Sequence, residues 1–238
     1  MLLSVVRHGD PDYEHDSLTD IGLLQAKALV KRFKVHGLDR IYTSPLGRAK
    51  MTAAPTCEAL GITPEVLEWT SEDLAFRDFS VPKKDCPEGR EWSFGAVRNV
   101  TYKFTDSAAL GKEWYKAPPF CGCRAKEGFE RIQRESDAFL ASLGYEREGD
   151  FYRVVRPNDE KVAVFCHYGF GTTWIAHLLS IVPPLFWSTF LINHSSITVI
   201  RFPNDKEGFI SPMCLTLSDC SHIYEAGIPM KFENWIDY

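Results

Sequence analysis

Two side chains that could do chemistry stand together near the start of the chain, where Arg7 and His8 follow an apolar run over residues 2–6. Such a run is typical of a buried strand in a parallel sheet, and open α/β sheets bind ligands beyond the carboxyl ends of their strands. Arginine carries a fork of donors that fits a phosphate, and histidine is a nucleophile or a proton carrier. Gly9 lets the backbone turn and approach a ligand. We therefore hypothesise a ligand site here, against the alternative of a surface histidine that only forms hydrogen bonds.

A second basic residue, Arg48, follows a strand candidate at residues 39–42 and precedes an Ala-rich segment, residues 49–60, with helical spacing. Ser44 is predicted as the helix N-cap, with Pro45 in the first turn. Arg48 then lies beside unpaired backbone N–H groups, which favour an anion. Because a cation at this end of a helix is mildly unfavourable, an anionic ligand explains Arg48 better than a solvated surface position does.

The opening pattern is repeated late in the chain, where the apolar strand candidate at residues 161–166 is followed by His167 and Gly169. The next segment, residues 170–182, is apolar and predicts a buried helix. The alternative is a lone histidine that caps this helix. Two strand-to-helix junctions that both place a histidine before a nearby glycine favour a shared site.

Carboxylates follow another strand candidate, residues 65–69, as Glu72 and Asp73. They would supply an acid or a base at one more strand end. By themselves they are uninformative, because acidic loops are common.

Taken together, these motifs resemble the histidine phosphatase superfamily, in its phosphoglycerate mutase-like branch. The resemblance covers essentially the whole chain and is carried in order by Arg7-His8-Gly9, Leu18-Thr19 with Gly22, Ser44-Pro45-Leu46 with Arg48-Ala49, and His167 with Gly169. It implies a three-layer α/β/α fold with a mostly parallel central sheet. It also implies that His8 accepts the phosphate, with Arg7, Arg48 and His167 around it.

The acid of the resembled family is a Glu shortly after the third strand. Glu72 matches that place best, with Asp73 and Asp78 as rivals and Glu68 as a weaker one. The chain departs from the family after Gly9, where Asp10-Pro11-Asp12-Tyr13 replaces the usual Glu or Gln followed by Ser or Thr. It also lacks the basic Arg-Arg cluster of phosphoglycerate mutases, which disfavours mutase activity more than phosphatase activity.

Composition favours a soluble enzyme. The chain has 238 residues, of which 45% are hydrophobic, and a net charge of −5, which argues against general nucleic-acid binding. Neither a signal peptide nor a membrane span is recognisable, and seven scattered cysteines predict reduced thiols in the cytoplasm. Cys121-Gly122-Cys123 lacks partners at ligand spacing, so we expect no metal and no cofactor. A homodimer is left open.

The rhythm of strands and helices predicts a single domain over residues 1–238. Further helices are expected at 20–36 and 127–143, and late strands at 195–202 and 209–217. Residues 76–124 interrupt this rhythm with aromatic and Pro-rich sequence, which predicts either a satellite core or a cap over the site. We favour a cap, with a substrate pocket made of Asp10, Tyr13, Trp92 and Trp114.

The sequence thus predicts a metal-independent phosphomonoesterase that acts through a phosphohistidine on a small phosphorylated metabolite with an apolar or ring-bearing part. A Cys-based phosphatase is disfavoured, because the residue six positions after Cys166 is Thr172 and not an arginine. A mutase-type phosphotransferase and a non-catalytic binder of phosphate ligands remain as alternatives.

Overall fold

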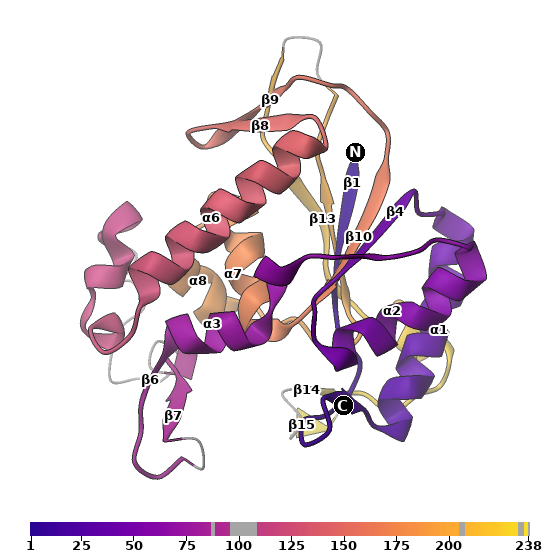
Figure 1. The fold of residues 1–238 in the computed structure, drawn as a ribbon, viewed down its shortest axis with the longest axis horizontal. Helices are drawn as coiled ribbons and strands as arrows, with labels where there is room; N and C mark the ends of the chain where they lie inside the picture. Colours follow the sequence, from indigo (N-terminus) through magenta and orange to yellow (C-terminus); the bar gives the residue numbers. More distant parts are fainter. Residues whose placement is uncertain (87–88, 96–108, 205–207, 233–235, 238) are drawn as a thin grey trace.

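A six-stranded sheet forms the centre of the computed structural model, which describes residues 1–86, 89–95, 109–204, 208–232 and 236–237 (Figure 1). Its strand order is β13-β11-β1-β10-β4-β5. The strands are β1 (Leu2–Arg7), β4 (Arg40–Thr43), β5 (Glu65–Val66), β10 (Lys161–Cys166), β11 (Ile197–Arg201) and β13 (Met213–Asp219). Strands β1, β10, β4 and β5 pair in parallel, and β11 is antiparallel to both of its neighbours. The predicted mostly parallel sheet is confirmed.

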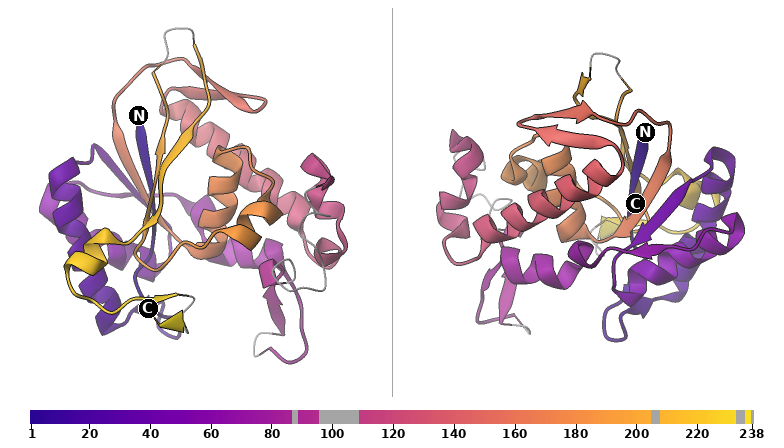
Figure 2. Two further views of the ribbon diagram at one scale, coloured as in Figure 1. Left: turned by 180° about the vertical axis from the view of Figure 1, so that it is seen from behind. Right: turned by 45° about the horizontal axis from the view of Figure 1, so that its top comes forward.

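Helices cover both faces of this sheet, as Figures 1 and 2 show. One face carries α1 (Asp20–His36) and α2 (Gly47–Leu60), with α9 (Ser221–Glu225) beside α1. The other carries α3 (Glu72–Phe79), α6 (Ala125–Ser142), α7 (Tyr168–Leu178) and α8 (Pro183–Thr189). The predicted three-layer α/β/α arrangement is therefore confirmed.

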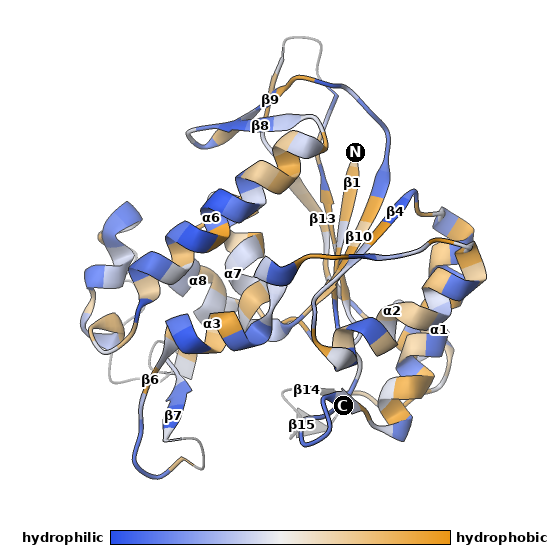
Figure 3. Cartoon of the chain, viewed as in Figure 1, coloured by the Kyte–Doolittle hydropathy of each residue, from blue (hydrophilic) through white to orange (hydrophobic). Residues whose placement is uncertain are grey.

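The alternation of side chains along the central strands explains the two covered faces. In β10, Val162 and Val164 belong to the large core with α6 and α7, whereas Ala163 and Phe165 belong to the smaller core with α1 and α2. Successive side chains of a strand point to opposite faces, so a sheet covered on both sides needs continuous apolar strands. Figure 3 shows this as hydrophobic colour along the central strands, whereas α1 and α6 alternate between polar and apolar residues.

Smaller elements surround this frame. The hairpin β2 (Pro11–Asp12) with β3 (Ser17–Leu18) follows β1, and β8 (Tyr145–Glu148), β9 (Phe151–Val154) and β12 (Phe209–Ile210) form a separate three-stranded sheet. Near the C-terminus, β14 (Lys231–Phe232) pairs with β15 (Ile236–Asp237). Among the described residues, no helix has the length and apolar character needed to cross a membrane.

Helix α1 has the predicted bounds, because its ends carry clear signals. The Thr19 side chain accepts a hydrogen bond from the backbone N of Gly22, and Gly37 ends the helix with a φ of +72°. Helix α6 begins two residues before its predicted start and ends at Ser142. The helix predicted over 170–182 is α7, which runs from Tyr168 to Leu178 and so ends four residues early. A separate helix, α8, begins after the predicted segment with Pro183 and Pro184.

Three local predictions were wrong. Helix α2 has Leu46 as its N-cap residue without a side-chain cap, and the Ser44 hydroxyl instead bonds to His167. The strand predicted at 65–69 ends at Val66 and is followed by a 3₁₀ turn, Glu68–Thr70. The strand predicted at 209–217 is two strands, of which β12 pairs with β9 and β13 pairs with β11.

The described parts of the aromatic segment at 76–124 lie beside α3 and α6 (Figure 1). It contains the end of α3, the hairpin β6 (Ser80–Pro82) with β7 (Arg90–Trp92), and the 3₁₀ helices η2 (Gly111–Lys116) and η3 (Pro118–Phe120). Residues 87–88 and 96–108 of the predicted cap lie outside the described residues. Phe94 and Trp114 are buried and pack against Trp187 of α8, so these parts have a shared aromatic core. The cap and the single domain stay predictions.

Candidate active site

The carboxyl ends of the three central parallel strands bring the two predicted histidines together. His8 follows β1 and His167 follows β10, and their ring centroids lie 5.2 Å apart. Backbone hydrogen bonds continue the sheet at this level, from His8 N to Cys166 O (2.9 Å) and from Ser44 N to Phe165 O (2.9 Å). The site is therefore built on the rigid end of the sheet, where α/β proteins place their ligands.

Only one of the two ring nitrogens of His8 has a hydrogen-bond partner among the described residues. Its Nδ1 lies 2.7 Å from the carbonyl oxygen of Gly9. A carbonyl only accepts, so Nδ1 carries the proton and the Nε2 lone pair is available. Burial and then the Arg7 charge lower the pKa of His8 well below its usual value. The hydrogen bond to Gly9 opposes this shift, and the Arg48 charge adds a smaller lowering. The imidazole is therefore neutral at neutral pH, as a nucleophile requires.

Arg7 is held by neutral partners. Its Nη1 donates to the carbonyl oxygen of Ile192 (2.8 Å), its Nη2 lies 2.6 Å from Nε2 of His194, and its guanidinium lies 5.0 Å from the ring centre of Tyr168. Burial lowers the pKa of Arg7. Its Nε is buried without a hydrogen-bond partner among the described residues. A buried cation without a paired carboxylate is an unusual arrangement, which an anionic ligand would complete.

Arg48 reaches the same site from the first turn of α2, but it has an acidic partner. Its Nη1 lies 2.6 Å from Oδ1 of Asp16, whose Oδ2 accepts a hydrogen bond from the backbone N of Gly47 (2.5 Å). The Arg48 guanidinium also lies 5.4 Å from the ring centre of Tyr13. The sequence analysis did not identify Asp16. Its only local signal was its place in the polar turn before α1, which is common in loops.

His167 is fully buried and is oriented by Ser44, whose Oγ lies 2.7 Å from Nε2. Its Nδ1 has no partner among the described residues. Burial, followed by the neighbouring His8 and the two arginines, lowers the pKa of His167 well below its usual value. The pattern of strand, histidine and glycine thus correctly indicated that this residue lies beside His8.

Glu72 belongs to α3, but its side chain contacts the N-terminal end of α7. Its Oε1 accepts from the backbone N of Gly169 (2.7 Å) and its Oε2 from that of Phe170 (2.8 Å). Helix N-terminal amides stabilise a carboxylate. Burial nevertheless raises the pKa of Glu72 above its usual value, because desolvation outweighs these two hydrogen bonds. This carboxyl is therefore suited to carry a proton.

The rival carboxylates lie in other surroundings. Asp73 and Glu68 are exposed. Asp78 is buried and ion-paired with Arg77 (2.8 Å) and Arg131 (3.2 Å), which is a structural role. Geometry therefore favours Glu72 over all three, and its role as the acid stays a prediction.

Of the four residues predicted for the substrate pocket, two lie next to the site. Tyr13 is 60% exposed, and its ring centre lies 6.5 Å from that of His8. The Trp92 ring packs on Gly169, so closely that a Cβ at Gly169 would lie 2.4 Å from it. Trp92 also stacks on Phe94, with ring centres 4.9 Å apart. These two aromatic rings flank the histidine and the α7 N-terminus.

The other two residues have different roles. The carboxylate of Asp10 turns away from a substrate pocket, because it accepts from Oγ1 of Thr19 (2.7 Å) and lies 3.5 Å from Nδ1 of His194. Trp114 is 1% exposed and packs in the aromatic core against Trp187 and Phe120. The structure thus gives no support to either residue as part of a pocket at His8.

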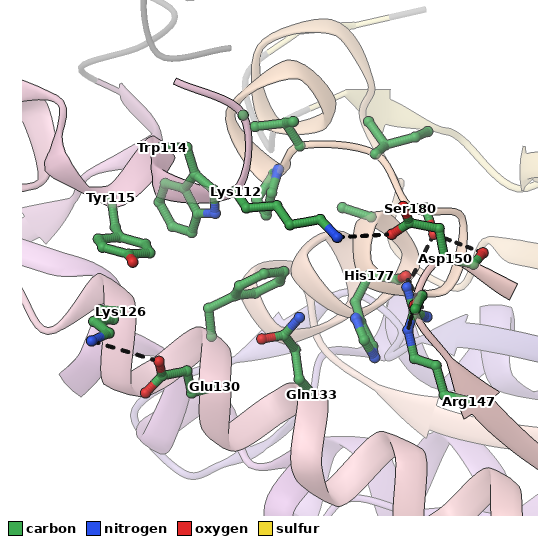
Figure 4. A pocket seen from close by; sticks show the side chains of 17 residues that line it. Lys112, Trp114, Tyr115, Lys126, Glu130, Gln133, Arg147, Asp150, His177 and Ser180 are labelled. Carbon is green, nitrogen blue, oxygen red and sulfur yellow. Dashed lines mark hydrogen bonds and ion pairs between the residues drawn. The ribbon is translucent and has the colours of Figure 1, made fainter. Parts of the chain in front are cut away.

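Trp114 instead borders a separate cavity of about 250 Å³ (Figure 4). Residues of η2, including Lys112 and Tyr115, line one side of it, and residues of α6, including Glu130 and Gln133, line another. His177, near the C-terminal end of α7, also lines it. No predicted catalytic or phosphate-binding residue is among the residues that line this cavity.

His194 is a site residue that the sequence analysis missed. Its ring centre lies 5.5 Å from that of His8, and it is buried in the loop between α8 and β11. No strand ends directly before it and no glycine follows it closely, as they do at His8 and His167. Its position depends on the antiparallel β11, which returns the chain to the edge of β1.

The described residues contain no group of three or more side chains that could hold a metal ion. Cys121 and Cys123 are free thiols, and their Sγ atoms donate to the backbone carbonyl oxygens of Ala117 (3.7 Å) and Phe120 (3.3 Å). What the site does offer is a neutral histidine with a free Nε2, two guanidinium groups, a second histidine and a carboxyl with a raised pKa.

Comparison with known proteins shows what the chain is similar to. Residues 3–74 match the model of the histidine phosphatase superfamily (branch 1). The adenosylcobalamin/alpha-ribazole phosphatases of Salmonella typhi and Salmonella typhimurium are each 25% identical to the chain over 197 residues, which are 79% of this chain and 84% of the relative.

Solved structures share the fold. A phosphoserine phosphatase from Entamoeba histolytica superposes with a TM-score of 0.59 at 18% identity, covering 93% of this chain and 98% of that one. The alpha-ribazole phosphatase from Shigella flexneri gives a TM-score of 0.58 at 16% identity, covering 92% and 97%. Residues 3–74 thus match the histidine phosphatase model, the curated relatives to which the chain is similar are phosphatases, and the chain shares the fold of the solved structures.

Proposed function

We propose that the chain hydrolyses a small phosphate monoester through a phosphohistidine on His8. The observation that carries this proposal is the free Nε2 of a buried, neutral His8 beside two guanidinium groups and His167. The bond from Nδ1 to Gly9 fixes the tautomer that leaves Nε2 unprotonated. Arg7, Arg48 and His167 each keep a buried nitrogen without a partner among the described residues, so the cluster has donors to spare for a phosphate.

In the first step, His8 Nε2 attacks phosphorus and the bond from phosphorus to the ester oxygen breaks. The Glu72 carboxyl donates its proton to the departing oxygen, and the product alcohol leaves. Arg7 and Arg48 stabilise the charge on the remaining phosphate oxygens. The raised pKa of Glu72 supports this role, because part of the population then carries the proton that the leaving group needs.

In the second step, the Glu72 carboxylate takes a proton from a water molecule, whose oxygen attacks the phosphohistidine. The bond from phosphorus to Nε2 breaks, inorganic phosphate leaves, and His8 and protonated Glu72 are regenerated. The charge that a bound metal supplies in other phosphatases is provided here by two arginines, so we propose that turnover requires no metal and no cofactor.

The substrate proposed is a small phosphorylated metabolite with an apolar or ring-bearing part. The support is the aromatic border of the site, which includes Tyr13, Trp92 and Tyr168. Several relatives are named for phosphoserine or α-ribazole phosphate chemistry, which agrees with a monoester without choosing between these compounds. Hydrolysis in the cytoplasm remains our expectation, consistent with the free state of all seven cysteines.

The deciding experiment follows turnover of 4-nitrophenyl phosphate and labelling of the protein by the phosphate of a radioactive monoester. We expect the wild type to turn over and to carry an acid-labile label, and His8→Ala to lose both while keeping its melting temperature. Turnover that persists in His8→Ala would overturn the mechanism. Tight phosphate binding without turnover in the wild type would favour the non-catalytic binder, and interconversion of phosphoglycerates without phosphate release would favour a mutase.

A further inference from the structure

His194 makes a contact that fixes its protonation state. Its Nε2 lies 2.6 Å from Nη2 of Arg7. A guanidinium only donates, so Nε2 of His194 must accept and the imidazole must be neutral with its proton on Nδ1. His194 is buried, and Nη1 of Arg7 is already bound to the Ile192 carbonyl in the same loop. This loop therefore holds both terminal nitrogens of the guanidinium.

Asp10 supplies the other end of this chain of contacts. Its Oδ1 lies 3.5 Å from Nδ1 of His194, which favours the tautomer that Arg7 needs. Asp10 is itself held in place, because its backbone N donates to Oε1 of Gln25 (2.8 Å) and its Oδ2 accepts from Oγ1 of Thr19 (2.7 Å). The chain of contacts runs from the N-terminus of α1 through Asp10 and His194 to Arg7.

The loop around His194 is fixed independently of Arg7. The backbone N of Ser195 donates to the carbonyl oxygen of His8 (2.9 Å), and Oγ of Ser195 lies 3.0 Å from Nε2 of His222. Ser195 has a φ of +60°, a conformation that costs free energy in residues other than glycine. The loop accepts this strain and places His194 beside both Arg7 and His8.

An arginine bound by a neutral acceptor keeps more of its charge available for an anionic ligand than an arginine paired with a carboxylate does. Arg48 is paired with the carboxylate of Asp16, so part of its charge is compensated. Arg7 has no carboxylate within ion-pair distance among the described residues. Its orientation is fixed by hydrogen bonds to neutral acceptors, so its charge is not ion-paired within the described residues and can act on an anion in a buried setting, where charge interactions are strong.

We propose that His194, oriented by Asp10, is a positioning residue that holds the Arg7 guanidinium toward the substrate phosphate without neutralising it. This inference rests on the proposed function for its catalytic consequence, although its consequence for phosphate binding does not. Three substitutions separate the hydrogen bond from the charge. His194→Gln keeps a neutral acceptor, His194→Glu keeps an acceptor but adds a negative charge, and His194→Leu removes the acceptor.

We expect His194→Leu to lower kcat/KM for 4-nitrophenyl phosphate by about 10- to 100-fold, because one oriented transition-state donor is misplaced. His194→Glu should lower kcat/KM by about as much, although it keeps an acceptor. His194→Gln should have a kcat/KM within about threefold of the wild-type value. In an Arg7→Ala background, His194→Leu should change kcat/KM by less than about twofold, since the pair acts as one unit. The kcat/KM of Asp10→Asn should lie between the values of His194→Gln and His194→Leu.

A matched control is His177→Gln. His177 is also buried and also has a ring nitrogen near a carboxylate, with Nε2 3.0 Å from Oδ1 of Asp137, but it borders the separate cavity of Figure 4. His177→Gln should have a kcat/KM within about twofold of the wild-type value. If His177→Gln and His194→Leu reduce kcat/KM equally, or if the losses of Arg7→Ala and His194→Leu add, the positioning role is refuted.

Two measurements do not depend on turnover. Calorimetric titration with inorganic phosphate should show a Kd that is about tenfold weaker in His194→Leu and nearly unchanged in His194→Gln. Imidazole ¹⁵N shifts of the wild type should show His194 protonated at Nδ1 alone at pH 7. A wild type without turnover that still shows both results would refute the proposed function and retain the positioning role, whereas an Nε2-protonated His194 would refute the positioning role. His194→Gln keeps the test valid if His194→Leu fails to fold.

Discussion

Helix α7 connects two polar clusters that are made from the same kinds of residue. At its N-terminal end, His167 lies beside His8, and the amides of Gly169 and Phe170 bind Glu72. At its C-terminal end, His177 lies 3.0 Å from Asp137, and Nη1 of Arg147 donates to the His177 carbonyl (3.1 Å). Each cluster thus combines a buried histidine, a carboxylate and an arginine.

The two clusters differ in what they leave unpaired. Arg147 donates to Gly149 O, the Tyr152 hydroxyl, His177 O and the Ser180 hydroxyl, so its hydrogen-bonding groups are used within the protein. At the other end, Arg7, Arg48 and His167 each retain a buried nitrogen without a partner among the described residues. Around the separate cavity, the buried unpaired atom among the described lining residues is the neutral Nε1 of Trp114. Buried ionisable side chains that each keep an unpaired nitrogen, rather than residue type, therefore distinguish the site at the N-terminal end.

The largest effect is expected from the arginines. Arg48→Ala should lower kcat/KM by about two to four decades, because it removes a charged donor to the transition state. Arg147→Ala, its counterpart at the other end of α7, should lower stability and leave kcat/KM within a few-fold. Steady-state kinetics with 4-nitrophenyl phosphate and a melting curve measure both. Equal kinetic losses would show that the two clusters do not differ in function.

The second prediction concerns Glu72. Glu72→Gln should reduce kcat by about 10²-fold or more for alkyl phosphates, whose leaving groups need a proton, and less in the phosphorylation step of 4-nitrophenyl phosphate. Asp137→Asn, the matched change beside His177, should leave the ratio between the two substrates unchanged. A leaving-group dependence that stays the same in Glu72→Gln would move the acid to another carboxylate.

The third prediction concerns how the buried histidines make the stability of the fold depend on pH. Burial lowers the pKa of His8, His167, His177 and His194, and it lowers the pKa of His222 to about 4. Below about pH 6.5 the unfolded chain binds protons at these residues and the folded chain does not. The free energy of unfolding should therefore fall as the pH drops from 6.5 to 4.5, by up to about 1.4 kcal/mol per pH unit for each histidine.

Urea titrations across this pH range test the prediction. His177→Gln should make the decrease shallower while leaving turnover unchanged at neutral pH. A stability that is constant between pH 6.5 and 4.5 would show that the histidines are protonated in the folded state as readily as in the unfolded chain.

The smallest effect is expected from the two tryptophans. Trp92→Ala should change the ratio of kcat/KM between a ring-bearing monoester and a small alkyl phosphate by about 3- to 10-fold, because Trp92 lies against Gly169 at the N-terminal end of α7. Trp114→Phe should leave this ratio unchanged, since its ring is part of the aromatic core with Phe120 and Trp187. A change in the ratio for Trp114→Phe alone would reverse the assignment of the two rings.

Much of the site could be predicted from local sequence because its residues occupy strand ends. Apolar strands determine where β1 and β10 lie, and a histidine directly after each strand must then be at the same edge of the sheet. The bounds of α1 were predictable for a related reason, since Thr19 and Gly37 are local signals. Predictions failed where a side chain was used over a long range, as for Ser44, which bonds to His167 rather than capping α2.

Residue types and spacing alone determined the α/β fold, the pairing of His8 with His167 and the presence of two arginines near them, because periodicity and strand ends are local properties of the chain. The tertiary structure decided which carboxyl lies at the amides of α7, that Asp16 pairs with Arg48, that Trp114 belongs to a core remote from His8, and that His194 contacts Arg7. Each of these depends on segments far apart in sequence that meet only when β11 and the helices pack against the sheet. Spacing along the chain contains no information about such contacts, since burial and hydrogen-bond partners are set by the packing of the whole molecule.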